Sequence, residues 1–191
     1  MTNTTTKRIA LQNYEHEHDC PFEAFITNLG KYNEGELIGE WVKFPCDSEE
    51  LEQVFERIGI NEYYEEFFIT DYDCYVPGLY DKLGEYESIE TLNELAETIE
   101  SLDSWEYDTL CAVLEAQSFE SLEDIITEAQ DLNNYTLIDA HDNYDLGYYF
   151  AIECDCLNIP DSIVNYFDFE AYGRDISFDG TFTEKGFLMN C

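Results

Sequence analysis

The sequence predicts an α+β protein that is divided into three small units. Three observations support this prediction: strand-like segments lie toward both ends of the chain, the middle has helical periodicity, and 191 residues suffice for two or three small units. We expect the units at residues 22–84, 85–131 and 132–191, after a weakly ordered lead-in over residues 1–21.

The first unit is predicted to hold three strands and a helix. Phe22–Leu29 and Glu36–Phe44 have strand composition, and the six residues between them include two glycines and an asparagine, which suit a hairpin loop. A helix is expected to begin at the cap Ser48 and to stop at Gly59. Glu66–Asp73 is the third expected strand.

The middle unit is predicted to consist of three short helices. Ser88 can cap the first, and Asp103 and Glu106 have the spacing of a capping box for the second. Ser121 and Asp124 begin the third. Apolar residues recur at helical spacing after these caps. They include Ile89, Leu92, Leu95, Ala96, Ile99, Leu122, Ile125 and Ala129.

The last unit returns to mixed structure. Tyr135–Ala140 is predicted to be a strand, and Asp145–Cys154 a helix. Another short helix is expected over Pro160–Phe167. Ile176–Phe187 resembles a β-hairpin, with its turn expected at Asp179–Gly180. The whole pattern is that of an α+β protein.

The charge of the chain is its most unusual property. Forty-four Asp and Glu face eight Lys and Arg, which gives a formal net charge of -36. With 45% hydrophobic and 16% aromatic residues, the chain is not a disordered acidic tail and should fold despite its self-repulsion. Residues 83–173 contain 23 Asp and Glu but no Lys or Arg. Most of these acids must therefore face solvent or a partner.

This charge can be compared with that of duplex DNA. B-DNA carries one negative charge per about 1.7 Å of axis, so the chain matches about 60 Å of duplex. Imitation of a rod predicts an elongated protein. High solubility and adaptation to salt are the alternative explanations of the charge, although the many Tyr, Phe and Ile residues fit salt adaptation poorly.

Acidic residues of the middle unit are the candidates for a DNA-like surface. Glu90, Glu94 and Glu97 form one helical row that rises about 6 Å and then about 4.5 Å along the axis, the same order as the phosphate spacing of a strand. The bland alternative is a solvated helix face, which normally carries lysines as well. The full candidate set is Glu85, Glu87, Glu90, Glu94, Glu97, Glu100, Glu115, Glu120, Glu123, Asp124 and Glu128.

Catalysis and bound cofactors are not expected. The chain has no nucleophile elbow, Walker loop, dinucleotide fingerprint or zinc-protease motif, and a lone His141 is more often structural than catalytic. Asp142–Glu153 has the length of a calcium loop but lacks side-chain oxygens at its third and fifth positions. The Cys154/Cys156 and His16/His18 pairs lack the usual zinc spacing. We expect no metal site.

A cytoplasmic protein with reduced thiols is expected. The seven cysteines are an odd number without the spacing of a small secreted framework. The start of the chain lacks the apolar run of a secretory signal, and no segment approaches 18 consecutive apolar residues. Neither a membrane nor nucleic acid, both of which carry negative charge, is an expected partner.

An aromatic cluster is a candidate dimer contact. Aromatic residues are enriched at the cores of interfaces because they bury a large area and keep a polar handle. Ordinary packing in the protein core is the equally weighted alternative. The cluster consists of Tyr144, Tyr148, Tyr149 and Phe150.

Three segments of the sequence match the motifs of one protein family. The run NYFDFEAYGRD followed by DGTF, within Pro160–Phe182, resembles the C-terminal antirestriction motif of the ArdA antirestriction family. The block NLGKYNEGELIGEWVKFP at residues 28–45 and FITDYD at residues 68–73 resemble its N-terminal part. The matches occur in the family's order. The candidate motif residues are Asp161, Tyr166, Asp168, Glu170, Tyr172, Arg174 and Asp175.

The resemblance implies more than the residues show alone. ArdA proteins are non-catalytic DNA mimics of mobile elements that occupy the DNA-binding groove of type I restriction–modification enzymes, and they are elongated, three-domain dimers. Arg174 is expected to organise the fold by pairing with Asp168 or Asp175, in preference to touching the partner. The rival hypothesis is an acidic binding module or chaperone for basic proteins.

Overall fold

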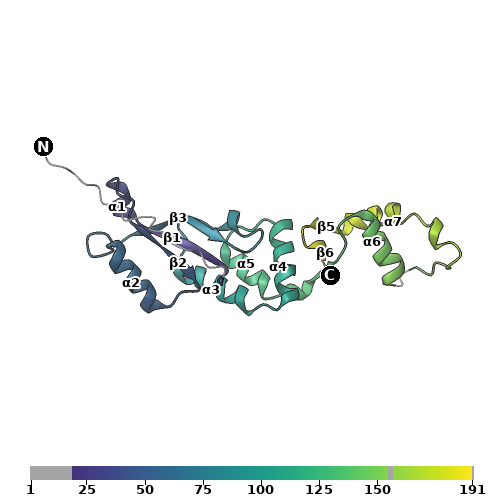
Figure 1. The fold of residues 1–191 in the computed structure, drawn as a ribbon, viewed down its shortest axis with the longest axis horizontal. Helices are drawn as coiled ribbons and strands as arrows, with labels where there is room; N and C mark the ends of the chain where they lie inside the picture. Colours follow the sequence, from purple (N-terminus) through teal and green to yellow (C-terminus); the bar gives the residue numbers. More distant parts are fainter. Residues whose placement is uncertain (1–18, 155–156, 191) are drawn as a thin grey trace. The chain divides into compact units, whose positions relative to one another are not determined.

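The computed structural model describes residues 19–154 and 157–190. Its helices and two small antiparallel sheets confirm the mixed α+β class (Figure 1). Contacts divide the chain into two units, Met1–Ser101 with Ser121–Ile126, and Leu102–Glu120 with Thr127–Cys191. The elongated arrangement of three domains and their limits stay predictions, and the expected lead-in lies almost entirely outside the described residues.

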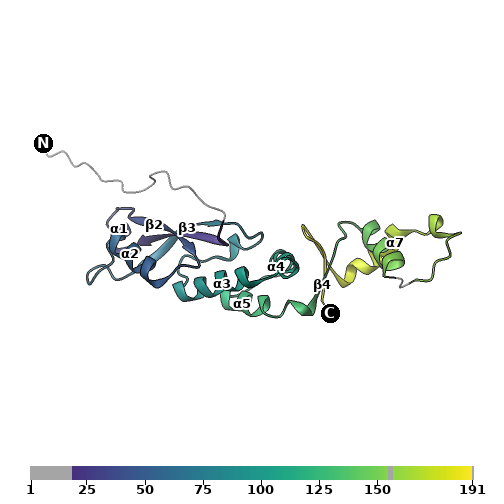
Figure 2. The ribbon, with the colours of Figure 1, turned by 60° about the horizontal axis from the view of Figure 1, so that its bottom comes forward.

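The first unit is built on a three-stranded antiparallel sheet in the order β2-β1-β3. The strands are β1 (Phe22–Asn28), β2 (Gly39–Phe44) and β3 (Phe67–Cys74). Every residue of β1 is buried, because this central strand has a neighbour on both edges and is covered on both faces. In Figure 2 the three strands lie together above α3 and α5.

A short helix, α1 (Leu29–Asn33), occupies most of the expected hairpin loop between β1 and β2. The Asn28 side chain explains this difference. Its Oδ1 accepts a hydrogen bond from the Lys31 backbone N–H at 3.0 Å, which caps a helical turn. Its Nδ2 donates to the Ile58 carbonyl at 3.1 Å, which ties the turn to the end of the next helix.

That next helix is α2 (Ser48–Ile58), and its N-cap is Asp47 rather than the expected Ser48. The Asp47 carboxylate accepts from the Glu50 backbone N–H at 2.7 Å, so Ser48 becomes the first helical residue. Gly59 ends the helix as predicted, with a left-handed φ of 80° that a residue bearing a Cβ adopts only with strain.

The three helices of the middle segment form with the predicted caps. They are α3 (Ile89–Ser101), α4 (Ser104–Ala116) and α5 (Leu122–Ala129). Ser88 Oγ accepts from the Thr91 N–H at 3.0 Å. Asp103 and Glu106 form the reciprocal capping box at 2.9 and 2.8 Å. The Ser121–Asp124 pair does the same for α5, at 3.2 and 3.1 Å.

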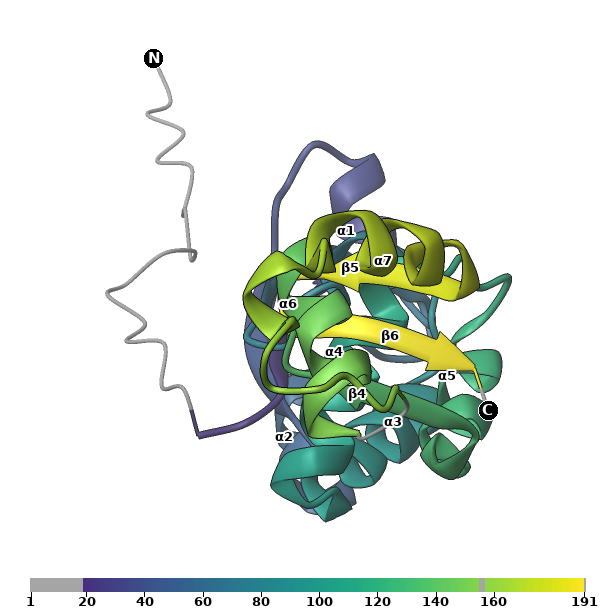
Figure 3. The same ribbon diagram turned by 90° about the vertical axis from the view of Figure 1, so that its right-hand side faces the viewer.

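The second unit contains an antiparallel sheet in the order β4-β6-β5. Its strands are β4 (Tyr135–Ile138), β5 (Gly180–Thr183) and β6 (Gly186–Asn190); β5 and β6 lie side by side in Figure 3. The expected hairpin turn at Asp179–Gly180 is wrong. Gly180 is extended and starts β5, whereas the turn lies at residues 184–185 and is closed by Gly186 with φ of 130°.

The β5–β6 turn is held to α4 at two points. The Glu115 carboxylate accepts from the Glu184 backbone N–H at 2.8 Å. Lys185 Nζ donates to Asp108 Oδ1 at 2.5 Å. Helix α4 therefore positions the central hairpin of the second unit through two carboxylates of the cation-free segment.

Two helices follow the second unit's first strand. Helix α6 (Asn143–Tyr148) continues as a π-helical turn over Tyr149–Glu153, close to the expected helix. Helix α7 (Phe169–Ile176) was not predicted. The expected helix over Pro160–Phe167 is absent except for a single 3-10 turn at Val164–Tyr166. Single 3-10 turns occur at Tyr80–Lys82, Leu132–Asn134, Val164–Tyr166 and Ser177–Asp179.

Glycines allow α6 and α7 to pack closely. A Cβ built on Gly173 would overlap the Asn143 carbonyl, and one built on Gly147 would overlap the Phe169 carbonyl. The two backbones therefore meet without side chains between them. This contact brings the antirestriction-like segment, which forms α7, against the aromatic cluster of α6.

Candidate functional site

Helix α3 has a buried apolar side and an exposed acidic side. Ile89, Leu92, Leu95, Ala96 and Ile99 are buried, which fixes the helix in the first unit. Between them the chain places glutamates that face solvent. These are Glu90, Glu94, Glu97 and Glu100.

The charge arrangement of α3 opposes its own stability. The last turn of the helix has no basic residue, and Glu97 and Glu100 lie at its negative end. Like charges three and four residues apart, such as Glu90 and Glu94, repel each other. Each term costs a few tenths of a kcal/mol. A solvated face without a role in binding would ordinarily interleave lysines here.

Other predicted carboxylates have structural partners. Glu115 accepts from the β5–β6 turn, Asp124 caps α5, and Glu123 Oε1 accepts from the Thr91 hydroxyl at 3.2 Å. Glu128 Oε1 accepts from the Tyr135 hydroxyl at 2.6 Å, and burial is the main cause of the raised pKa of Tyr135. Glu85 and Glu120 are exposed. The candidate set therefore divides into carboxylates open to a partner and carboxylates that also organise the fold.

Glu87, a member of the candidate acidic set, has a raised pKa. Burial raises the pKa of its carboxyl group, the nearby charge of Glu123 raises it further, and a backbone hydrogen bond at Gly84 opposes both. The two carboxylates lie close enough to repel each other, which indicates a local concentration of negative charge beside α3.

The antirestriction-like motif combines helix-forming and exposed residues. Asp168 caps α7 by accepting from the Ala171 N–H at 3.0 Å. Glu170 accepts from Asn143 Nδ2 on α6 at 3.3 Å, and Tyr172 packs edge-on against Phe167 at 5.7 Å.

The remaining motif residues point outward. Tyr166 is 87% exposed, and Asp161 is exposed as well. Arg174 lies 3.9 Å from Asp175, and both side chains are largely in solvent. A pair of this kind contributes little to stability. The motif thus presents several polar side chains next to the α6–α7 contact.

The aromatic cluster is divided between core and surface. Tyr149 and Phe150 pack against the buried cluster of Ile138, Ala140, Leu146 and Phe187. Tyr144 and Tyr148 stack at 6.4 Å, rest on Phe169 of α7, and are 50% and 38% exposed. These two tyrosines are the exposed members of the cluster, whereas Tyr149 and Phe150 are half-buried. The dimer contact stays a prediction.

The weaker candidates acquire ordinary structural positions. Asp142 caps α6 by accepting from the Asp145 N–H at 2.8 Å, so the segment that has calcium-loop length is largely helical. His141 is exposed and lies 3.3 Å from Asp139. Within residues 19–154 and 157–190, no group of three or more potential ligands could hold a metal ion. His16, His18 and Cys156 lie outside the described residues.

One acidic face was missed. Helix α2 exposes four glutamates, but its last turn carries Arg57, whose guanidinium binds Glu40 through two nitrogens at 2.7–3.2 Å. The predicted acidic surface was assigned to the segment without Lys or Arg, and Arg57 lies outside that segment. The exposed glutamates of α2 are Glu49, Glu50, Glu52 and Glu56.

The comparisons with known proteins place these features in a family. In the part of the chain that is described, no helix combines the length and apolarity that a membrane crossing requires. A search of curated protein sequences gave no match. The family model of the antirestriction protein ArdA matches residues 24–189, which include both units and the motif of α7. The chain therefore belongs to the ArdA antirestriction protein family.

Proposed function

We propose that the protein inhibits type I restriction–modification enzymes by competing with duplex DNA for their DNA-binding groove. The observation that carries this proposal is the exposed, cation-free row of glutamates on α3 in a member of an antirestriction family. A groove that binds phosphates does so largely through charge and position, without reading bases. Carboxylates at comparable spacing satisfy the same demand.

The proposed mechanism needs neither a cofactor nor catalysis. Phosphate contacts carry no sequence information, so the inhibitor can act on enzymes with different recognition sequences. Basic side chains of the enzyme would exchange their counterions for carboxylates, and binding should weaken steeply as salt rises. Because many acids share the work, removal of one should have little effect.

We also infer that the active form is a homodimer. The exposed Tyr144 and Tyr148 support this inference, because interface cores are enriched in aromatic side chains. In sedimentation measurements, Tyr148→Asp should lower the mass to that of a monomer. Tyr166→Asp, which changes a tyrosine that is 87% exposed away from this stack, should retain the dimer. An unchanged mass for a folded Tyr148→Asp variant would contradict the assignment.

Competition against DNA tests the proposed function. A type I enzyme would be bound to labelled duplex and titrated with the protein at low and high salt. The proposal predicts displacement near stoichiometric protein at low salt and strong attenuation at high salt. Absence of displacement from several active type I enzymes would contradict it.

A second titration separates the rival function. The protein would be offered a histone-like basic protein that lacks a duplex-shaped groove. An acidic binding module would bind that protein as tightly as it binds the restriction enzyme, whereas a DNA mimic should prefer the enzyme. Equal binding to both would favour the acidic module.

A further inference from the structure

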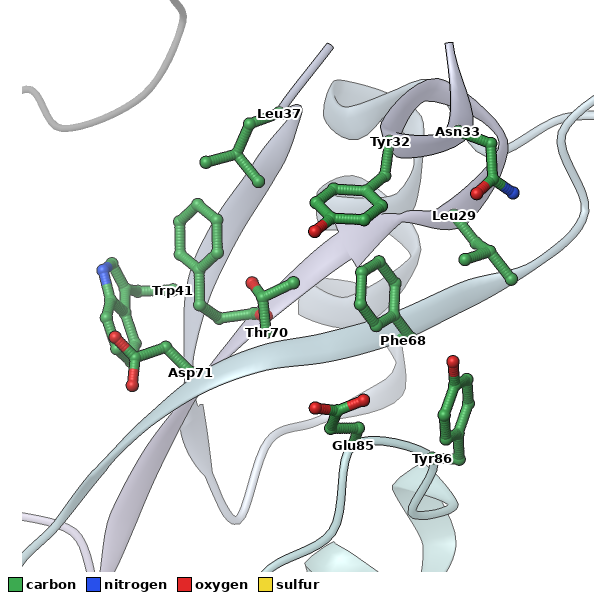
Figure 4. A pocket seen from close by; sticks show the side chains of 11 residues that line it. Leu29, Tyr32, Asn33, Leu37, Trp41, Phe68, Thr70, Asp71, Glu85 and Tyr86 are labelled. Carbon is green, nitrogen blue, oxygen red and sulfur yellow. The ribbon is translucent and has the colours of Figure 1, made fainter. Parts of the chain in front are cut away.

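The first unit contains an aromatic pocket that the acidic surface does not explain. It is a hollow of about 630 Å³ beside the sheet of the first unit, lined by residues between positions 25 and 86 (Figure 4). All of its lining residues belong to the first unit. They are Phe25, Leu29, Tyr32, Asn33, Leu37, Trp41, Phe68, Thr70, Asp71, Glu85 and Tyr86.

The walls present aromatic rings held by one another. Tyr32 meets Phe68 edge-on at 5.0 Å, and Phe68 lies nearly parallel to Tyr86 at 6.1 Å. Across the pocket Phe25 packs against Trp41 at 5.4 Å. Tyr32 and Tyr86 are 49% and 73% exposed, so their rings remain available to a ligand.

Two of the polar side chains at the pocket, those of Asp71 and Glu85, are carboxylates. Figure 4 shows the carboxylate of Asp71 beside Trp41 and that of Glu85 below Phe68. Both side chains are exposed, and neither has an ion-pair partner among the described residues. None of the lining residues, all of which are described, is Lys, Arg or His.

Backbone and side-chain hydrogen bonds fix the acidic edge of the pocket. The Ile69 N–H of β3 donates to the Glu85 carbonyl at 2.8 Å. The Tyr72 hydroxyl donates to the Gly84 carbonyl, also at 2.8 Å. The segment that carries Glu85 and Tyr86 is thereby anchored to the sheet, so ligand binding would not first have to order it.

We propose that this pocket receives an arginine side chain from a partner protein. A guanidinium group can stack on the exposed faces of Tyr32 or Tyr86 and donate to the carboxylate of Glu85 or Asp71. The aliphatic part of the side chain can cover Leu37 and Phe68.

Other ligand classes fit less well. An anion would be repelled by the two carboxylates, and a purely apolar side chain would make no use of their charge. A lysine ammonium satisfies the charge but cannot stack as a plane on an aromatic ring. The proposal does not depend on imitation of duplex DNA, because it concerns a pocket that reads one side chain.

The direct test is a titration of the full-length protein with N-acetyl-arginine methylamide, followed by aromatic NMR signals. The expected shifts are confined to the pocket rings, chiefly those of Tyr32, Phe68 and Tyr86. The matching citrulline derivative, which has the same shape without the charge, should bind at least about fivefold more weakly, as expected for loss of a cation–π contact.

Matched variants distinguish the pocket from the general acidity of the protein. Glu85→Gln and Tyr86→Leu should each weaken arginine binding about threefold to fivefold. Glu62→Gln and Tyr63→Leu change an exposed acid and a 91% exposed tyrosine that do not line the pocket, and they should have no effect.

Two results would overturn the proposal. Equal binding of arginine and citrulline would show that charge is not recognised. Shifts that spread over all acidic surfaces, with the same arginine affinity in the pocket variants and the control variants, would show only counterion attraction. No restriction enzyme is used, so failure of the pocket and failure of the proposed antirestriction mechanism are separate results.

Discussion

Helices α3 and α7 use their side chains in different ways. Helix α3 directs a row of glutamates into solvent, and none of the four makes an ion pair among the residues that the structure describes. Helix α7 is held by specific contacts, with Asp168 at its cap, Phe169 buried, and Gly173 against the backbone of α6.

This difference explains how each region can tolerate change. A surface that acts through summed charge depends on the number and approximate position of its acids, so a single substitution should matter little. A close contact between backbones depends on the identity of one residue.

The largest expected effect is that of Gly173→Ala on folding. The new Cβ would overlap the Asn143 carbonyl, and overpacking of this kind costs about 3 kcal/mol. Alanine regains about 1 kcal/mol of helix propensity, which leaves a net loss of about 2 kcal/mol. Urea denaturation followed by the signal of the second unit would measure it. Asp175→Ala, at an exposed position of the same helix, should change stability by less than about 0.5 kcal/mol.

An intermediate effect of opposite sign is expected in α3. Glu100→Lys places a cation at the negative end of the helix and should stabilise the first unit by about 0.3–1 kcal/mol. The same change should slightly weaken inhibition of the restriction enzyme. Thermal unfolding and DNA competition, measured on one preparation, would show whether stability and inhibition change in opposite directions. A variant that gained stability and kept its full inhibition would indicate that the charge of this end has no role in inhibition.

The smallest expected effect concerns the pH dependence of stability at Glu87. Because its folded-state pKa is raised, the charged carboxylate destabilises the folded protein at neutral pH. This cost is relieved as the pH falls through the raised pKa toward the unfolded value. Glu87→Gln should therefore be slightly more stable than the parent protein at pH 7, and the difference should disappear near pH 4. A difference that grew as the pH fell would contradict the assignment.

Much of the fold follows from local chemistry in the sequence. The capping pairs Asp103–Glu106 and Ser121–Asp124 were predictable because both partners lie within three residues of each other. The Gly59 stop was predictable because a left-handed residue at a helix end favours glycine.

The sequence-based predictions are wrong where contacts between distant parts of the chain determine the local structure. The hairpin turn lies at residues 184–185 because Glu115 and Asp108 of α4 bind it, which no local pattern reveals. Helix α7 depends on the packing of Gly173 against α6. The aromatic pocket joins residues that are up to 61 positions apart in the sequence, so it could not be read from spacing along the chain.

The most direct test of the central claim compares two variants of equal charge. One replaces Glu90, Glu94, Glu97 and Glu100 of α3 with glutamine, and the other replaces Glu49, Glu50, Glu52 and Glu56 of α2. In competition with duplex DNA for a type I enzyme, the α3 variant should lose about tenfold in potency, or about 1.4 kcal/mol, and the α2 variant clearly less. Equal losses would mean that total charge, rather than the α3 surface, determines inhibition.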